Sequence, residues 1–253
     1  MNKFNHVLIT GASSGIGEAL AMYYASHEVK MLSLCGRNEE RLNKTAEECR
    51  KKGAQVEVRI VDVADAQAVE AWINEANEKM PLNLVFANAG VATLEETSEN
   101  VRRTFNINVM GVVNTVLPAI ELFKKAPAEQ MKHIAITSSI AGYHGMPTCP
   151  SYSATKAGVK AWGEGLRLAL APLGIRVSTI CPGFIRSRIT DKNTCPMPYF
   201  MEADKAAEII AKRIKRNVGL IAFPWQMRLA TWLGSVLPNR ISDFIYSKLP
   251  YKV

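Results

Sequence analysis

Tyr152 and Lys156 stand four residues apart in a stretch with helical spacing, so on a helix they lie on one face, a turn apart. An ammonium group near a phenol favours the phenolate, and we therefore expect the pKa of Tyr152 to lie below its usual value of about 10. Such a phenol could exchange a proton with a carbonyl or alcohol oxygen near neutral pH. Ser139, upstream of this pair, could orient the same oxygen with its hydroxyl. Taken alone, the pair is equally compatible with a surface tyrosine and a solvated lysine.

A glycine-rich turn near the start of the chain is the second feature that points to a chemical role. The apolar run 6–10 predicts a strand, residues 11–17 read Gly-Ala-Ser-Ser-Gly-Ile-Gly, and residues 18–26 have a helical pattern. Strand, glycine turn and helix in this order are what a dinucleotide-binding turn requires. Glycines let the backbone approach a pyrophosphate closely, and the start of the helix offers free N–H donors to the anion.

The end of the second predicted strand, 30–34, bears on the choice of cofactor. An acidic residue near this point would bind the hydroxyls of an adenosine ribose and repel a 2′-phosphate. Here Gly36 and Arg37 follow the strand, and a guanidinium suits a phosphate by its charge and fork geometry. We therefore predict NADP(H) over NAD(H). The alternative is that Arg37 is a solvated loop residue.

The elements that must position these residues alternate regularly along the chain. Further strands are expected at 56–61, 82–86, 131–137 and 174–181, and helices at 39–52, 65–79, 98–123 and 151–171. A repeated strand–helix unit predicts a parallel sheet with right-handed crossovers and helices on both faces. Ligands bind beyond the carboxyl ends of such strands, where one cofactor could contact residues 11–17, Arg37, Asp62 and 88–90. No linker or internal repeat interrupts the chain, so we expect one domain over residues 1–253.

Composition narrows the class of protein. Of the 253 residues 48% are hydrophobic and 21% are charged, as is usual for a globular protein. The net charge of +8 comes from scattered Lys and Arg, so the pattern does not support nucleic-acid binding. The five cysteines are widely spaced without a Cys/His ligand pattern, so we expect neither a zinc site nor disulfides. With no signal peptide and no apolar run of about 18 residues, we expect a cytoplasmic protein.

These segments together resemble the short-chain dehydrogenase/reductase (SDR) family over residues 1 to about 222. The resemblance rests on Thr10-Gly11-Ala12-Ser13-Ser14-Gly15-Ile16-Gly17, Asp62, Asn88-Ala89-Gly90, Asn108, Ser139, Tyr152, Lys156 and Pro182-Gly183. It implies a Rossmann-type three-layer α/β/α sandwich with a seven-stranded parallel sheet. It also implies hydride exchange between C4 of a nicotinamide and an alcohol or ketone carbon, in a homodimer or homotetramer formed through helices 98–123 and 151–171.

The resemblance also implies a role for each matched residue. Tyr152 resembles the general acid for reduction and base for oxidation, whose pKa Lys156 would depress while holding the nicotinamide ribose. Ser139 would bind the substrate oxygen and Asn108 would maintain a proton-relay water, whereas Ser138 matches no catalytic position. The implied cofactor contacts are Gly11, Ser13, Ser14, Gly15, Ile16, Gly17, Arg37, Asp62, Val63, Asn88, Ala89, Gly90, Tyr152, Lys156, Pro182, Gly183, Ile185 and Ser187. No metal is implied, and Ser187 replaces the family's usual threonine.

Two segments should shape the substrate side of this site. Residues 186–201 contain Cys195, Pro196 and Pro198, so we expect a loop or lid there. A second group lies between Ser139 and Tyr152 and should flank the pocket, with His144 as a wall residue rather than a catalyst. Its members are Tyr143, His144, Met146, Thr148 and Cys149. Their side chains suggest an apolar carbonyl compound.

Residues 224–249 extend beyond the resemblance and are rich in large apolar side chains, with Arg228, Arg240 and Lys248 among them. We expect an extra helical segment that covers the pocket or packs on a second subunit. The alternative is a basic, aromatic surface helix that rests on an anionic membrane.

These observations favour an NADP(H)-dependent oxidoreductase acting on an apolar ketone, aldehyde or secondary alcohol. Two alternatives stay open: a 3-ketoacyl reductase for carrier- or CoA-linked chains, and a protein that senses NADP(H) without turnover. The complete set Asn108, Ser139, Tyr152 and Lys156 speaks against the sensor, which has no need of a tuned phenol.

Overall fold

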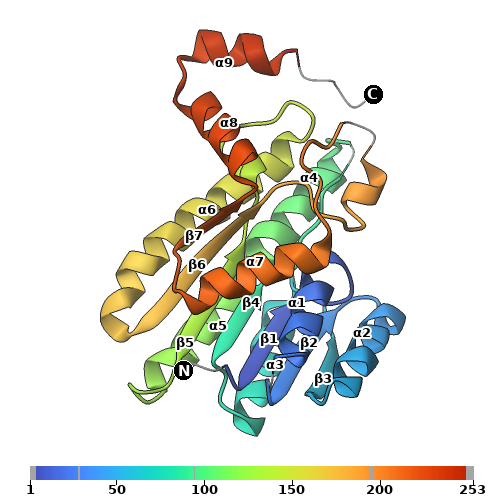
Figure 1. Cartoon of the computed structure of the whole chain (residues 1–253), viewed down its shortest axis with the longest axis vertical. Helices are drawn as coiled ribbons and strands as arrows, with labels where there is room; N and C mark the ends of the chain where they lie inside the picture. Colours follow the sequence, from blue (N-terminus) through green and yellow to red (C-terminus); the bar gives the residue numbers. More distant parts are fainter. Residues whose placement is uncertain (1–3, 28, 94, 194–195, 249–253) are drawn as a thin grey trace.

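The computed structural model describes residues 4–27, 29–93, 95–193 and 196–248. Its sheet has seven parallel strands in the order β3-β2-β1-β4-β5-β6-β7, which confirms the predicted Rossmann-type sandwich (Figure 1). The strands are β1 His6–Thr10, β2 Met31–Gly36, β3 Gln55–Ile60, β4 Leu84–Ala87, β5 Lys132–Thr137, β6 Ile175–Pro182 and β7 Leu220–Phe223. Each predicted strand is present within two residues of its expected limits, and β7 completes the sheet beside β6.

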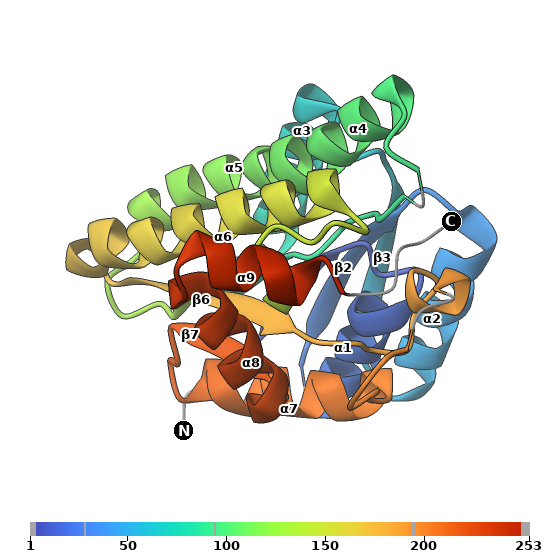
Figure 2. The ribbon, with the colours of Figure 1, turned by 90° about the horizontal axis from the view of Figure 1, so that it is seen from above.

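The helices between the strands form the two outer layers of the sandwich. They are α1 Gly15–Ala25, α2 Glu39–Lys51, α3 Ala66–Lys79, α4 Ser98–Phe105, α5 Gly111–Lys125, α6 Pro150–Leu170 and α7 Ala203–Lys215. Figure 2 shows α3, α5 and α6 along one side of the sheet and α1, α2 and α7 along the other. This arrangement follows from the repeated strand–helix unit, because a parallel sheet must have both faces covered.

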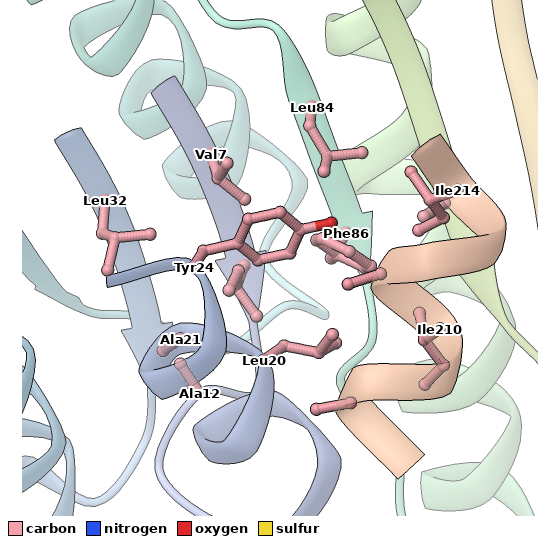
Figure 3. Packing of buried hydrophobic residues seen from close by; sticks show 14 of the residues in the cluster. Val7, Ala12, Leu20, Ala21, Tyr24, Leu32, Leu84, Phe86, Ile210 and Ile214 are labelled. Atoms are coloured by element: carbon pink, nitrogen blue, oxygen red, sulfur yellow. The ribbon is translucent and has the colours of Figure 1, made fainter. Parts of the chain in front are cut away.

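Two hydrophobic clusters hold the layers together, one on each face of the sheet. In β1, Val7 and Ile9 point into the cluster under α1 and α7, whereas Leu8 points into the cluster under α3, α5 and α6. In Figure 3, Leu20 and Tyr24 of α1 pack with Ile210 of α7 and the strand residues Leu84 and Phe86. The near-continuous burial of the central strands explains why their sequences are apolar runs rather than alternating patterns.

The helix expected over 98–123 is interrupted. A π-helical turn, Asn106–Met110, separates α4 from α5. By length and composition alone Ser98–Lys125 could cross a membrane, which the sequence expectation did not allow for. Half of its most apolar window is buried, however, and α5 packs Val112, Val116 and Phe123 against the sheet.

Two helices follow the last strand: α8 Trp225–Val236 and α9 Asn239–Tyr246. Figure 1 shows them rising beyond the carboxyl ends of the strands, away from the three layers. Helix α8 leans on the sheet only near its start, where Met227 packs with Ile140, Cys181 and Ala222. The helical segment expected over 224–249 is therefore present, apart from Leu249, which lies outside the described residues.

Candidate active site

The strand order brings the candidate residues to one edge of the sheet. The turns after β1, β4, β5 and β6 all leave the sheet at its carboxyl edge, because the strands are parallel and adjacent. The chain reverses its direction of winding between β1 and β4, and such a switch point opens a crevice for a ligand. The residues that the sequence singled out before and after this point therefore face a common space.

The glycine turn after β1 has the backbone shape that a pyrophosphate requires. Gly11 and Gly15 have φ values of +70° and +59°, a left-handed conformation that favours glycine. A Cβ on Gly17 would collide with the carbonyl oxygen of Gly11 and lie 2.7 Å from Nδ2 of Asn88. Ser14 precedes α1 without a side-chain cap, so the first N–H groups of the helix are not satisfied by that side chain. The turn can thus bring backbone donors close to an anion.

Thr10 and Asn88 tie the ends of β1, β4 and β5 together. The Thr10 hydroxyl accepts hydrogen bonds from the backbone N–H groups of Asn88, at 2.9 Å, and Ala89, at 3.1 Å. The Asn88 amide donates to the Thr10 carbonyl oxygen and accepts from the Thr137 hydroxyl. Residues 88–90, expected to line the cofactor, are therefore held directly against the glycine turn.

Tyr152 and Ser139 meet at the start of α6. The Ser139 hydroxyl is hydrogen-bonded to the Tyr152 phenol and accepts the Ala141 backbone N–H at 3.1 Å. Ser139 also caps the short 3₁₀ turn Ile140–Gly142, which fixes its side chain. The two hydroxyl groups could therefore contact one substrate oxygen together.

Lys156 lies one turn along α6 and is almost fully buried, with 3% of its surface exposed. Its ammonium group donates to the Thr137 carbonyl oxygen at 2.9 Å and lies 5.7 Å from the centre of the Tyr152 ring. Gly90 adjoins it, since a Cβ built there would lie 3.3 Å from both Lys156 Nζ and Asn108 Oδ1. Lys156 and Asn108 thus both lie beside Gly90. Ser139 approaches Tyr152 from the turn after β5.

Asn108 occupies the π-helical turn and clamps the loop after β4. Its side-chain oxygen accepts the Val91 backbone N–H, and its amide donates to the Val91 carbonyl oxygen, both at 2.8 Å. The same amide donates to the Thr155 hydroxyl at 3.2 Å, which connects the turn to α6. A π turn inside a helix often marks a functional position, and here it directs a buried amide at the site.

The expected low pKa of Tyr152 is wrong in this structure. Burial raises the pKa of Tyr152 to about 12, and the Ser139 hydrogen bond opposes that rise only in part. Burial also lowers the pKa of Lys156 to about 8. Removing the phenolate from water is the main cause of the rise, and the neighbouring ammonium group is itself desolvated and bonded to Thr137. Tyr152 is therefore a protonated phenol at neutral pH.

Arg37 stands beyond β2, close to the glycine turn. Ser13 adjoins Gly36, the residue before Arg37, because a Cβ on Gly36 would lie 3.2 Å from the Ser13 hydroxyl oxygen. The guanidinium lies 3.5 Å from a carboxylate oxygen of Asp62, and both side chains are nearly half exposed. Such a long, exposed ion pair stabilises little and leaves most of the guanidinium donors free. Val63 is fixed behind this group by the Asn114 amide, which donates to its carbonyl oxygen.

The segment after β6 folds back toward the glycine turn. A Cβ on Gly15 would lie 2.9 Å from Ser187 Cβ, so the two loops touch. Ser187 is locked by Thr190, whose hydroxyl accepts the Ser187 N–H at 2.8 Å. Ile185 is buried and forms a β-bridge with Met201. The predicted loop therefore carries a 3₁₀ turn, Thr190–Lys192, and the bridge from Ile185 to Met201 joins its two ends. Cys195 lies outside the described residues.

The C-terminal helices contact the substrate side of the site. Gly183 lies against α8, since a Cβ there would approach Met227 Sδ to 3.0 Å. His144, expected in the pocket wall, stacks on Tyr246 of α9 with the ring centres 4.1 Å apart. Tyr143 joins α6 to the cluster under α8, with Lys160 Nζ 4.9 Å from its ring centre. These helices thus buttress the loop between Ser139 and Tyr152.

Glu96 is a contributor that sequence reasoning missed. Its carboxylate accepts the Ser151 hydroxyl at 2.8 Å and the Ser151 backbone N–H at 3.1 Å, one residue before Tyr152. A carboxylate at the start of a helix satisfies free N–H groups and complements the helix dipole. Glu96 and Ser151 are far apart in sequence, so no local pattern could have revealed the pair. The roles of Thr10 and Thr137 could have been predicted more easily, because each is a polar residue at the end of an apolar strand.

A separate cavity of about 980 Å³ lies at the opposite, amino edge of the sheet. Lys30, Lys132 and Arg176 are among the residues that line it, and none of the candidate site residues does. Within the described part of the chain, no three His, Cys, Asp or Glu side chains are grouped to hold a metal ion. The chemistry argued above therefore belongs to the carboxyl edge alone.

Comparison with known proteins places this geometry in a family. The family model for short chain dehydrogenases matches residues 5–196. An uncharacterized oxidoreductase of Myxococcus xanthus is 36% identical over 249 residues, covering 95% of this chain and 96% of the relative. Estradiol 17-beta-dehydrogenase 11 of Rattus norvegicus is 28% identical over 254 residues, covering 97% of this chain and 84% of the relative.

Solved structures of the same family superpose on most of the chain. A short chain dehydrogenase/reductase from Burkholderia phymatum in complex with NAD has a TM-score of 0.82 at 26% identity, covering 99% of this chain and 98% of the other. A short-chain dehydrogenase from Sphingobium yanoikuyae in complex with NADPH has a TM-score of 0.80 at 26% identity, covering 97% and 96%. The chain belongs to the short-chain dehydrogenase family and is an oxidoreductase.

Proposed function

We propose that this protein is an NADP(H)-dependent oxidoreductase that exchanges a hydride between a nicotinamide cofactor and an apolar ketone, aldehyde or secondary alcohol. The observation that carries the proposal is the convergence of Ser139, Tyr152 and Lys156 beside a glycine turn shaped for a pyrophosphate. A bound nicotinamide would supply or accept the hydride at C4.

Tyr152 acts as the general acid in the direction of reduction. Its phenol keeps its proton at neutral pH, because burial raises its pKa to about 12. It can therefore donate that proton to a carbonyl oxygen as negative charge develops there. In oxidation the same group takes the proton back as a phenolate, as microscopic reversibility requires.

Ser139 and Lys156 complete the proton-transfer site. The Ser139 hydroxyl orients the substrate oxygen toward Tyr152, since the 3₁₀ turn that it caps fixes its position. Lys156 provides a buried positive charge beside Gly90, where it can bind the hydroxyls of a nicotinamide ribose. Asn108 holds the loop after β4 in place and keeps Gly90 next to the ammonium group.

NADP(H) is proposed over NAD(H) because Arg37, beyond β2, and Ser13, in the glycine turn beside Gly36, offer phosphate-binding groups. Solved relatives hold either cofactor, so the family does not decide between them. Arg37→Ala should weaken NADPH binding about 10- to 100-fold, as expected when a charge-assisted hydrogen bond is lost. The dissociation constant for NADH, measured by the same fluorescence titration, should change much less. Equal losses for the two cofactors would refute the 2′-phosphate assignment.

An apolar substrate is proposed from the residues around the site. Met146 and the loop carrying His144 flank Tyr152, and the C-terminal helices that back them are rich in apolar side chains. The name of the Rattus norvegicus relative refers to a steroid alcohol, which supports the same substrate class. Oligomerisation through α5 and α6 is proposed as well, because Leu117 and Leu168 are exposed there.

Turnover assays distinguish this enzyme from a protein that binds the cofactor without reaction. NADPH oxidation should be followed for the wild type with ketones and aldehydes of increasing chain length, steroid-like ketones and a 3-ketoacyl thioester. Turnover that increases with apolar size supports the proposal, and a strong preference for the thioester favours the acyl-chain alternative. NADPH binding with no turnover on the whole panel would favour the sensor.

A further inference from the structure

Helix α8 carries a stripe of large apolar side chains that faces solvent. Trp225, Leu229, Trp232 and Val236 are spaced by four, three and four residues, so they lie on one face of the helix. They are exposed by 68%, 46%, 49% and 57%. The opposite face is already occupied, because Gly234 is buried there against the Tyr246 ring.

Helix α9 repeats this arrangement. Its apolar residues Ile241, Phe244 and Ile245 are exposed by 48%, 61% and 46%. Its other face is used within the fold, since Tyr246 stacks on His144. The outer face of α8 and α9 is therefore left without a partner among the described residues, whereas monomeric proteins seldom expose so many large apolar groups together.

The charges on this outer face have one predominant sign. Arg228, Arg240 and Lys248 are exposed, although Arg228 also interacts with the Tyr143 side chain, and Asp243 is the one acidic residue between positions 225 and 248. The Lys248 ammonium group lies 4.0 Å from the centre of the Phe244 ring, so charge and apolar surface are interleaved. Basic side chains among tryptophans and aliphatic residues are typical of helices that lie at the surface of an anionic bilayer.

A second copy of the chain suits this face less well. A two-fold interface sets the same patch against itself, so a surface with three cations and one carboxylate would face an equally basic surface. Like charges facing each other in an interface oppose association. Anionic lipid headgroups would instead compensate the cations while the acyl region takes up the apolar stripe.

We propose that the outer face of α8 and α9 docks this protein on an anionic phospholipid bilayer. The face adjoins the loop between Ser139 and Tyr152 through the His144–Tyr246 stack, so docking brings the substrate side of the site to the lipid surface. Apolar carbonyl compounds dissolved in the bilayer could then enter the site directly as substrates. This last point rests on the proposed function, but vesicle binding needs neither cofactor nor turnover, so the two proposals can fail separately.

Cosedimentation of the full chain with vesicles tests the docking. Vesicles of phosphatidylcholine mixed with phosphatidylglycerol should bind the protein about tenfold or more tightly than phosphatidylcholine alone, and high salt should reduce the difference. The double variant Trp232→Ser with Phe244→Ser should lose about tenfold or more of the binding. The matched control, Ile60→Ser with Leu173→Ser, removes two exposed apolar groups from the end of β3 and from the turn after α6, outside both α8/α9 and the proposed subunit interface, and should bind like the wild type.

Failure to bind anionic vesicles at low salt would overturn the proposal, and so would equal losses in the two double variants. If the protein binds no vesicles but forms a dimer, and the double variant Trp232→Ser with Phe244→Ser dissociates that dimer, the face belongs to an interface with a second copy. If that variant does not fold, tryptophan emission of the wild type decides instead. Trp225 and Trp232 are exposed, whereas Trp72 is buried and Trp162 is partly buried, so a blue shift on anionic vesicles supports docking and unchanged emission overturns it.

Discussion

Helices α6 and α8 both begin at the carboxyl edge of the sheet, yet α6 buries polar side chains in its first half whereas α8 exposes large apolar ones. The first half of α6 buries Ser151, Ser153, Thr155 and Lys156. Each of these four has a hydrogen-bond partner in a neighbouring turn or element. Helix α8 buries only Gly234 and exposes two tryptophans.

This difference shows how two departures from ordinary burial can indicate two kinds of function. Burying polar groups costs free energy unless each is hydrogen-bonded, and in α6 the partners also fix Tyr152 and Lys156 in place. Exposing large apolar groups costs free energy until another surface covers them, and within the fold nothing described covers the stripe on α8. The first helix is built for chemistry and the second for docking.

The pH dependence of turnover should give the largest effect on the α6 side of this comparison. kcat/KM for NADPH-dependent reduction reports ionising groups of the free enzyme. Since burial lowers the pKa of Lys156 to about 8, kcat/KM should be level below that pH and fall above it as the ammonium group loses its charge. The fall should approach tenfold per pH unit. A profile that stays level to about pH 10 would show that this charge is not needed.

Glycine-to-alanine changes in the two regions should separate them by stability. A Cβ on Gly142 would lie 2.7 Å from the Lys156 carbonyl carbon and 2.8 Å from the Ala157 nitrogen, which are backbone atoms that cannot yield. Gly142→Ala should therefore lower the free energy of unfolding by about 1–3 kcal/mol and reduce turnover. Urea denaturation with an unchanged m value measures the first effect.

Gly234→Ala is the matched change in α8. Its Cβ would meet the end of the Tyr246 side chain, which can turn away, and alanine favours the helix by up to about 1 kcal/mol. The free energy of unfolding should thus change by less than about 1 kcal/mol. Equal destabilisation by the two variants would remove the distinction between a tightly packed α6 and a loosely attached α8.

The smallest effect is expected from Tyr246→Ala, which removes the stack on His144. Because Tyr246 is only half-buried, global stability should change by less than about 1 kcal/mol. Amide hydrogen exchange should rise in residues 239–246 and 143–149 while the rest of α6 stays protected. Exchange that rises throughout α6 would show that α9 supports the whole site.

Much of the fold could be predicted because its signals are local. Apolar runs such as 6–10 and glycines such as Gly11 determine strands and turns by their own conformational preferences. The parallel order then follows from the repeated strand–helix unit. The same logic places the site residues at one edge of the sheet.

What could not be predicted depends on distant partners. The apolar pattern runs without a break through 106–110, and the π turn there is held by the Asn108 clamp on Val91. The predicted lowering of the Tyr152 pKa was wrong because sequence spacing shows the neighbouring ammonium group but not the burial of both groups. The composition of residues 224–249 indicated apolar helices, but only the structure shows which face of each is left uncovered.

The central claim is that Tyr152 transfers the proton while the rest of the site holds the cofactor. Tyr152→Phe removes one oxygen from a residue whose ring already has its place, so the dissociation constant for NADPH should stay within about threefold of the wild-type value. The rate of carbonyl reduction should fall by about 10³-fold, in the range expected for a lost general acid. A variant that keeps more than about a tenth of the wild-type kcat would contradict the account.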